Sequence, residues 1–262
     1  MKVVTITNQK GGVGKTTTAH ILCTGLASRG FRVLAVDIDP QTNLTYTAGF
    51  MPGEVQPTLY ELFRGSAKPS LQATVKAKAG FSIIPGSLDL AGADMEFTQD
   101  RREYLLQEIL RAYKKEFDFC IIDTPPTLGI LTVNALTASD TVIIPMGADI
   151  YSIQGLAQLQ GLIQNVQRYT NPALTVAGLL ITRFNARAVI NRQLRDTMWT
   201  VARNLDTFLF TTAIREAVAI KEVQFLQSDI FTEYPKANIT RDYNNFINEF
   251  LEGMGRNEQK KL

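Results

Sequence analysis

A cluster of glycines, lysines and threonines near the N-terminus has the residue types and spacing that suit phosphate. Residues 8–18 read Asn-Gln-Lys-Gly-Gly-Val-Gly-Lys-Thr-Thr-Thr. An apolar run at residues 2–7 precedes them and a helix-like stretch at residues 16–28 follows, which is the strand, loop and helix order that a phosphate-binding loop requires. Glycine lets the backbone approach phosphate closely, and the N–H groups of the loop and of the helix N-terminus then face the anion.

Two side chains at the end of this loop are suited to particular tasks. Lys15 is placed to reach the β- and γ-phosphates of a nucleotide, and the Thr16 hydroxyl to ligate Mg²⁺. The usual pattern, G-x-x-x-x-G-K-[ST], is met at its C-terminal end, but its first glycine position holds Gln9, and a second lysine, Lys10, precedes the double glycine. The expected nucleotide-binding residues of the loop are Lys10, Gly11, Gly12, Val13, Gly14, Lys15, Thr16 and Thr17.

With the extra lysine, residues 10–17 resemble the deviant Walker A loop of the ParA/MinD family of ATPases, and the chain is identified as a member of its ParA/Soj-type partition ATPases. In that family the extra lysine reaches across a dimer interface to the nucleotide of the partner subunit. The resemblance therefore implies that Lys10 and Lys15 are both catalytic. It also implies a homodimer that forms on ATP binding.

Carboxylates follow two further apolar runs. Residues 31–37 are expected to form a buried strand that leads into Asp37 and Asp39, and residues 117–123 a second one that ends in Asp123. Ligands of open α/β sheets bind outside the carboxyl ends of the strands. A carboxylate there could hold Mg²⁺ or orient the attacking water, although a capped turn would explain Asp37 and Asp39 equally well.

The resemblance separates these carboxylates by role. Residues 36–41 resemble the switch I segment of ParA proteins, which implies that Asp39 positions the attacking water and that Asp37 gives structural or outer-shell support. Asp123 with the Thr-Pro-Pro that follows resembles the family's Walker B segment. The implied metal-binding residues are Thr16, Asp39 and Asp123, and the implied cofactors are ATP and Mg²⁺.

The rest of the chain alternates strand and helix patterns. This alternation implies right-handed crossovers and a single doubly wound, mainly parallel α/β sheet with helices on both faces. Residues 42–57 are expected to form a mobile loop, and residues 58–64 a helix with a capping box of Thr58 and Glu61. We expect one domain at residues 1–254 and a polar tail at 255–262. Further strands are predicted at 81–84, 140–145 and 174–182, and helices at 104–113, 128–138, 152–169 and 241–254.

A basic stretch in the last third of the chain is the candidate DNA contact. Residues 183–203 hold five arginines and one acidic residue. A solvated helix face is the alternative, but ParA proteins bind DNA without sequence preference through C-terminal basic residues, only as ATP-bound dimers, and through phosphates. The resemblance also places Asn185 and Pro235 near the adenine base. The DNA-binding candidates are Arg187, Arg192, Arg195, Arg203, Arg215 and Lys221.

Composition narrows the choice of function. The 27 basic and 25 acidic residues give a net charge of only +2, so DNA binding must rest on a local patch. Cys23 and Cys120 match no metal-binding spacing, which indicates a reducing cytosol. There is no apolar run of membrane-spanning length, and the tail has too few apolar residues for a membrane-surface helix. We therefore expect a cytoplasmic, nucleoid-associated protein that does not bind a membrane.

These features predict a Mg-ATP-dependent, dimerising ATPase that binds non-specific DNA and partitions or positions plasmid, chromosome or other cargo. The resemblance implies slow hydrolysis until a ParB-type centromere-binding or adaptor protein stimulates it. Three alternatives stay open. They are a MinD-like membrane-cycling ATPase, a reductase like the nitrogenase iron protein, and a nucleotide-dependent scaffold that does not hydrolyse ATP.

Overall fold

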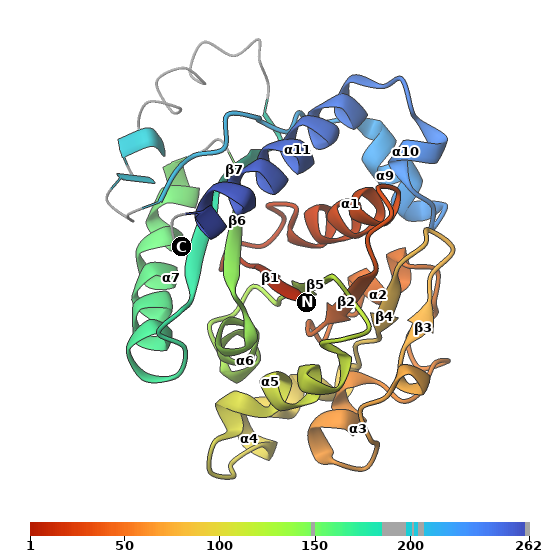
Figure 1. The fold of residues 1–262 in the computed structure, drawn as a ribbon, viewed down its shortest axis with the longest axis vertical. Helices are drawn as coiled ribbons and strands as arrows, with labels where there is room; N and C mark the ends of the chain where they lie inside the picture. Colours follow the sequence, from red (N-terminus) through yellow and green to blue (C-terminus); the bar gives the residue numbers. More distant parts are fainter. Residues whose placement is uncertain (148–149, 185–197, 201, 204–206, 260–262) are drawn as a thin grey trace.

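A seven-stranded sheet runs through the protein, whose computed structural model describes residues 1–147, 150–184, 198–200, 202–203 and 207–259 (Figure 1). Its strands are β1 (Lys2–Ile6), β2 (Val33–Asp37), β3 (Val75–Lys76), β4 (Ser82–Ile84), β5 (Phe119–Asp123), β6 (Thr141–Gly147) and β7 (Thr175–Thr182). Their order is β3-β4-β2-β5-β1-β6-β7, and the paired strands are parallel except β3 with β4. The predicted doubly wound, mainly parallel sheet is confirmed.

Helices cover both faces of this sheet (Figure 1). One face packs against α1 (Lys15–Ala27) and α11 (Asn238–Gln259), and the other against α6 (Ile130–Ala138) and α7 (Ile150–Tyr169). The remaining helices are α2 (Asn43–Thr47), α3 (Leu59–Arg64), α4 (Ala93–Glu96), α5 (Leu105–Leu110), α9 (Val218–Phe225) and α10 (Ile230–Glu233), with 3₁₀ turns at Leu71–Ala73, Leu88–Gly92, Arg102–Tyr104 and Arg111–Tyr113.

The central strands are buried because both of their faces are covered. All residues of β2, β5 and β6 are buried, as a parallel sheet between two helical layers requires. Successive side chains alternate between the layers, since Ile121 of β5 joins the cluster under α1 and Ile122 the cluster under α6. Because these strands run parallel, their polar carboxyl ends come together at one edge of the sheet.

Several local predictions can be compared with the structure. The capping box is confirmed, with Thr58 N donating to Glu61 Oε2 at 2.8 Å. The loop predicted at residues 42–57 is wrong at its start, where α2 forms. The last helix runs to Gln259, past the predicted end at residue 254, because no proline there interrupts its hydrogen bonds. The division into a domain and a tail remains a prediction.

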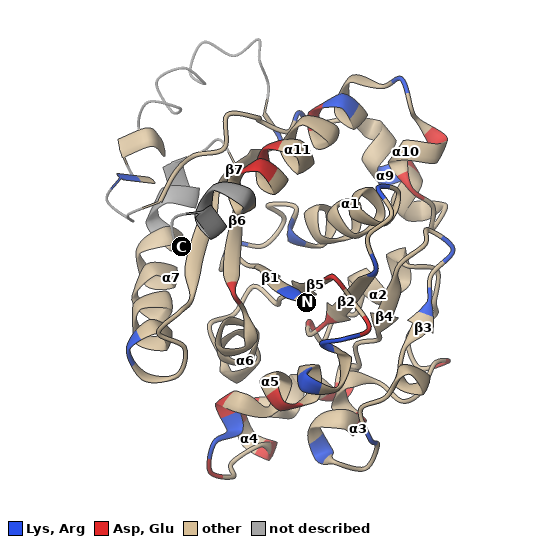
Figure 2. Ribbon diagram, viewed as in Figure 1, with Lys and Arg blue, Asp and Glu red and all other residues tan. Residues whose placement is uncertain are grey.

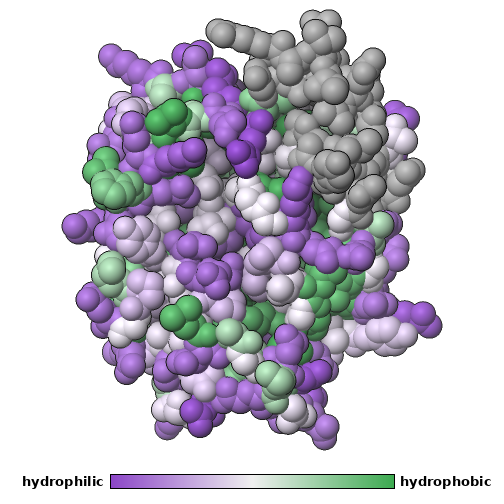
Figure 3. Space-filling view, turned by 180° about the vertical axis from the view of Figure 1, so that it is seen from behind, coloured by the Kyte–Doolittle hydropathy of each residue, from purple (hydrophilic) through white to green (hydrophobic). Residues whose placement is uncertain are grey.

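The surface is polar and mixed in charge. Lysines and arginines alternate with acidic residues over the visible ribbon (Figure 2), and from behind the molecule is mostly hydrophilic with separate hydrophobic groups (Figure 3). Within the described residues, no helix has both the length and the apolar character to cross a membrane.

Candidate active site

The loop between β1 and α1 is shaped by its glycines. Gly12 and Gly14 have φ angles of 72° and 82°, in the left-handed region where side chains with a Cβ are strained. Gly14 is the N-cap of α1, so the backbone turns directly into the helix. Asn8 fixes the start of the loop, because its amide donates to the Pro145 carbonyl at 2.7 Å and its Oδ1 accepts from Lys10 N at 3.0 Å. The first-turn N–H groups of α1 are thereby available to an anion.

Lys15 is held inside this loop. Its side chain is buried, with 7% exposed, and its ammonium donates to the Lys10 carbonyl at 3.3 Å. Burial lowers the pKa of Lys15, while the nearby carboxylates of Asp123 and Asp39 act in the opposite direction. The structure thus brings together the lysine and the two carboxylates that the sequence assigns to one site.

Asp123 is a fully buried carboxylate that lies close to the Thr16 hydroxyl but makes no well-formed hydrogen bond with it. Neither of its oxygens has a partner among the described residues, although the side chain is fully buried. Burial raises its pKa, with a further rise from Asp37, while Thr16 and Lys15 oppose that rise. Since an unpartnered buried carboxylate is costly, these oxygens fit a cation or the water bound to one. Thr16 and Asp123 are therefore suited to Mg²⁺.

Asp37 and Asp39 have different surroundings. Asp37 accepts hydrogen bonds from Thr45 N at 2.8 Å, Thr45 Oγ1 at 2.7 Å and Asp39 N at 3.3 Å. The bonds to Thr45 connect β2 to α2. They fit the structural role that the sequence assigns to Asp37. Asp39 is also buried, but its carboxylate makes only a local turn contact, from Gln41 N at 3.0 Å.

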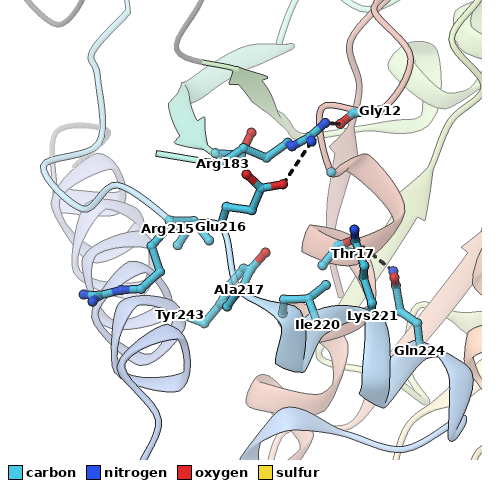
Figure 4. A pocket seen from close by; sticks show the side chains of 13 residues that line it. Gly12, Thr17, Arg183, Arg215, Glu216, Ala217, Ile220, Lys221, Gln224 and Tyr243 are labelled. Atoms are coloured by element: carbon cyan, nitrogen blue, oxygen red, sulfur yellow. Dashed lines mark hydrogen bonds and ion pairs between the residues drawn. The ribbon is translucent and has the colours of Figure 1, made fainter. Parts of the chain in front are cut away.

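A cavity of about 210 Å³ opens beside the loop (Figure 4). An ion pair of 3.0 Å between Arg183 and Glu216 lies in its wall, and Arg183 also donates to the Gly12 carbonyl at 3.4 Å. A molecule with phosphates in the loop would extend into this space. The lining residues are Gly12, Gly14, Thr17, Thr182, Arg183, Ile214, Arg215, Glu216, Ala217, Ile220, Lys221, Gln224 and Tyr243.

Only some of the residues predicted to contact the adenine base or DNA lie at the cavity. Pro235 is exposed and is not among the lining residues of the cavity. Arg215 lies in the cavity wall, but its guanidinium forms bonds of 2.6 and 2.8 Å with Asp242 of α11. Lys221 also lies in the wall, whereas Arg203 is exposed. The other predicted residues, Asn185, Arg187, Arg192 and Arg195, lie outside the described part of the chain.

Sequence reasoning missed most of the cavity wall. Arg183 directly follows β7, Glu216 lies in the segment before α9 and Gln224 lies in α9, about 170 to 210 residues after the loop that they face. The one usable indication was the position of Arg183 directly after a predicted strand, at the edge where ligands bind.

Comparison with known proteins identifies the family. A family model described as an AAA domain matches residues 1–176. The sporulation initiation inhibitor protein Soj of Bacillus subtilis is 42% identical over 193 residues, which cover 73% of this chain and 76% of Soj. The chain belongs to the ParA/Soj family of partition ATPases. A second ParA/Soj relative, the chromosome partitioning protein ParA of Myxococcus xanthus, is 41% identical over 194 residues, covering 73% of this chain and 68% of that protein.

Solved structures resemble the ParA/Soj chain over nearly its full length. Cobyrinic acid a,c-diamide synthase of Mycobacterium smegmatis, with bound ADP and magnesium, has a TM-score of 0.85 and 32% identity, covering 97% of this chain and 95% of that one. An ATP complex of an aspartate-to-alanine variant of McdA from Cyanothece has a TM-score of 0.84 and 26% identity, covering 97% and 96%. The chain is thus a P-loop ATPase of the partition or positioning type.

Proposed function

We propose that this protein is a Mg-ATP-dependent ATPase that dimerises on binding ATP, binds DNA without sequence preference and partitions or positions cargo. One observation carries the nucleotide part of the proposal. The loop of residues 10–17 lies between the buried carboxylate of Asp123 and the cavity of about 210 Å³. We propose that the loop binds the phosphates, that Asp123 helps to bind the cation and that the cavity binds the nucleoside.

The residues divide the chemistry of hydrolysis among them. Thr16 and Asp123 would hold Mg²⁺, which supplies positive charge against the phosphates when it is bound. Lys15 and Lys10 stabilise the charge on the γ-phosphoryl group as water attacks in line and ADP leaves. Asp39 orients that water, and the cavity takes the adenosine. Burial costs Lys15 and Asp123 solvation, but it also strengthens their attraction for oppositely charged groups of the bound nucleotide and cation.

Dimerisation is proposed from Lys10. Its backbone is fixed by Asn8, and its side chain stays half-buried at the start of the loop, where a second subunit can approach. The family resemblance gives this lysine the role of reaching the partner's nucleotide. A site that needs two subunits would couple ATP binding to assembly.

DNA binding is proposed from the basic segment of residues 183–203. Its five arginines outnumber one acidic residue, and two of its described residues, Arg203 and Trp199, are both exposed. Contacts of this kind go to phosphates and weaken with salt. The proposed location is the nucleoid in the cytoplasm, and the proposed partner is a ParB-type centromere-binding or adaptor protein.

Phosphate release tests the enzymatic part. Wild-type protein with ATP, Mg²⁺, DNA and the partner should release phosphate above background, and Lys15→Ala should not. Release that stays at background would favour the non-hydrolysing scaffold. ATP-dependent co-sedimentation with liposomes in place of DNA binding would favour the membrane-cycling alternative.

The buried cysteines argue against the reductase alternative. Cys23 on α1 and Cys120 on β5 are both free thiols inside the core. Burial raises the pKa of each thiol, so both stay protonated. A cluster held at a dimer interface needs cysteines at the surface where the two subunits meet, and both of these cysteines lie in the core.

A further inference from the structure

Three cationic side chains line the cavity beside the loop, and two of them have carboxylate partners. Arg183 pairs with Glu216 at 3.0 Å. Arg215 is held by Asp242 through bonds of 2.6 and 2.8 Å, and its guanidinium turns away from the cavity towards α11 (Figure 4). Each guanidinium already shares its charge with a carboxylate, which weakens its attraction for a further anion.

Lys221 is the third cation, and its surroundings differ. In the described part of the chain, no carboxylate lies within ion-pair distance of its ammonium. The neighbouring Glu222 accepts a hydrogen bond of 2.6 Å from the Tyr234 hydroxyl. Figure 4 shows the Lys221 side chain extending from α9 along the cavity, on the side where Thr17 lies. Its charge is therefore directed at the cavity.

One hydrogen bond links α9 directly to the loop, in addition to the core packing of Val223 and Ile220. Gln224 Nε2 donates to Thr17 Oγ1 at 3.0 Å (Figure 4). Gln224 follows Lys221 by three residues, which places both on the same face of the helix. The bond therefore helps to set the distance between Lys221 and the residue that follows Thr16 in the loop.

We propose that Lys221 binds the α-phosphate of the nucleotide from α9, with Gln224 as its positioning residue. This inference rests on the proposed binding of ATP in the loop and cavity. A nucleotide with its β- and γ-phosphates on residues 10–16 and its adenosine in the cavity has its α-phosphate between them, beside Thr17. The Lys221 ammonium faces the expected position of the α-phosphate, and no carboxylate of the described residues forms an ion pair with it. On this assignment Lys221 binds the nucleotide and not DNA.

Calorimetric titration with ATP and with ADP tests the assignment. Because both nucleotides carry the α-phosphate, Lys221→Met should weaken both by about tenfold, the effect of losing a charged hydrogen bond at a partly exposed site. Lys221→Arg should restore most of the affinity. Lys78→Met, which removes an exposed lysine before β4, far along the chain from the loop, is the matched control and should bind both nucleotides as the wild type does.

Gln224 is tested through its coupling to Lys221. Gln224→Ala should weaken both nucleotides in the wild-type background but add little to Lys221→Met, because its effect passes through the lysine. A merely structural role would weaken binding equally in both backgrounds. That result would remove Gln224 from the proposal.

Other outcomes would overturn the role of Lys221. Unchanged affinities in Lys221→Met, or a loss for ATP alone, would contradict a contact with the α-phosphate. Loss of DNA retention at saturating ATP, with nucleotide affinity unchanged, would assign Lys221 to DNA instead. If the wild type binds neither nucleotide, the proposed function itself fails. If the wild type binds both and Lys221→Met binds them equally well, only the role of Lys221 fails.

Discussion

Asp37 and Asp123 lie opposite each other on the adjacent strands β2 and β5, yet only Asp37 has hydrogen-bond partners. Two neighbouring buried carboxylates therefore have opposite relations to the fold. Asp37 joins β2 to Thr45 of α2, while in the described residues the oxygens of Asp123 make no well-formed hydrogen bond and lie near Thr16 and Lys15. This difference separates a supporting residue from a ligand-binding one, and it gives opposite expectations for the same substitution.

At a pH where Asp123 is ionised, Asp123→Asn should stabilise the nucleotide-free protein by about 1–3 kcal/mol, because the cost of burying this carboxylate outweighs its attraction to Lys15. The same variant should lose ATP hydrolysis. Asp37→Asn is the matched control and should destabilise by a similar amount, since its amide nitrogen would have to face the backbone N–H of either Thr45 or Asp39. Urea denaturation measures both changes. An Asp123→Asn protein that is less stable than the wild type would show that the carboxylate has a partner in the fold.

The contribution of Asp123 to the stability of the nucleotide-free protein should fall as the pH rises, whereas the buried His20, whose pKa burial lowers to about 4, contributes in the opposite direction up to about pH 6.5. Burial raises the pKa of Asp123 in the folded state, so the folded protein binds that proton more tightly than the unfolded chain does. The contribution of Asp123 is then fully present below the ordinary carboxyl pKa of about 4, and falls above it by at most about 1.4 kcal/mol per pH unit until the raised pKa is passed. Urea denaturation at a series of pH values measures the slope.

The control for this pH dependence is Asp123→Asn, in which the slope should be smaller because one of the raised carboxyl groups is gone. Burial raises the pKa of Asp37 as well, so part of the slope should remain. Equal slopes in the two proteins would show that Asp123 does not titrate in this range.

Substitution of Lys15 should affect nucleotide binding, and substitution of Lys10 should affect ATP-dependent dimerisation. Lys15→Ala should abolish nucleotide binding, because its buried ammonium sits within the loop. Lys10→Ala should keep measurable ATP binding and lose ATP-dependent dimerisation. Light scattering with and without ATP measures the mass. An ATP-dependent dimer of unchanged mass in Lys10→Ala would contradict a role across the interface.

Asp39→Ala should trap the ATP-bound state on DNA, since Asp39 is proposed to orient water and not to bind nucleotide. Phosphate release should fall to background while ATP affinity is kept. DNA retention after ATP is diluted should last longer than in the wild type. Normal hydrolysis by this variant would remove Asp39 from the mechanism.

The loop and Asp123 could be predicted from the sequence because each is local. A few neighbouring residues are enough to recognise a glycine-rich turn between a strand and a helix. The same is true of an aspartate at the end of a buried strand. The parallel sheet could be predicted for the same reason, from short apolar runs that alternate with helices.

The cavity wall could not be predicted in this way. Lys221 and Gln224 face Thr17 only because α9 returns to the loop after about 200 residues of chain, and no local pattern records that return. Arg215 shows the same limit, since the family resemblance makes it a DNA-binding candidate while the fold pairs it with Asp242. Long-range ion pairs and hydrogen bonds decide which charges remain available to a ligand.

DNA retention measured with ATP, with ADP and without nucleotide, at low and at high salt, tests the central claim most directly. A nucleotide-gated dimer that contacts DNA phosphates should bind with ATP only, and its affinity should fall steeply as salt rises. Binding that is equal in the three nucleotide conditions, or absent in all of them, would contradict the account.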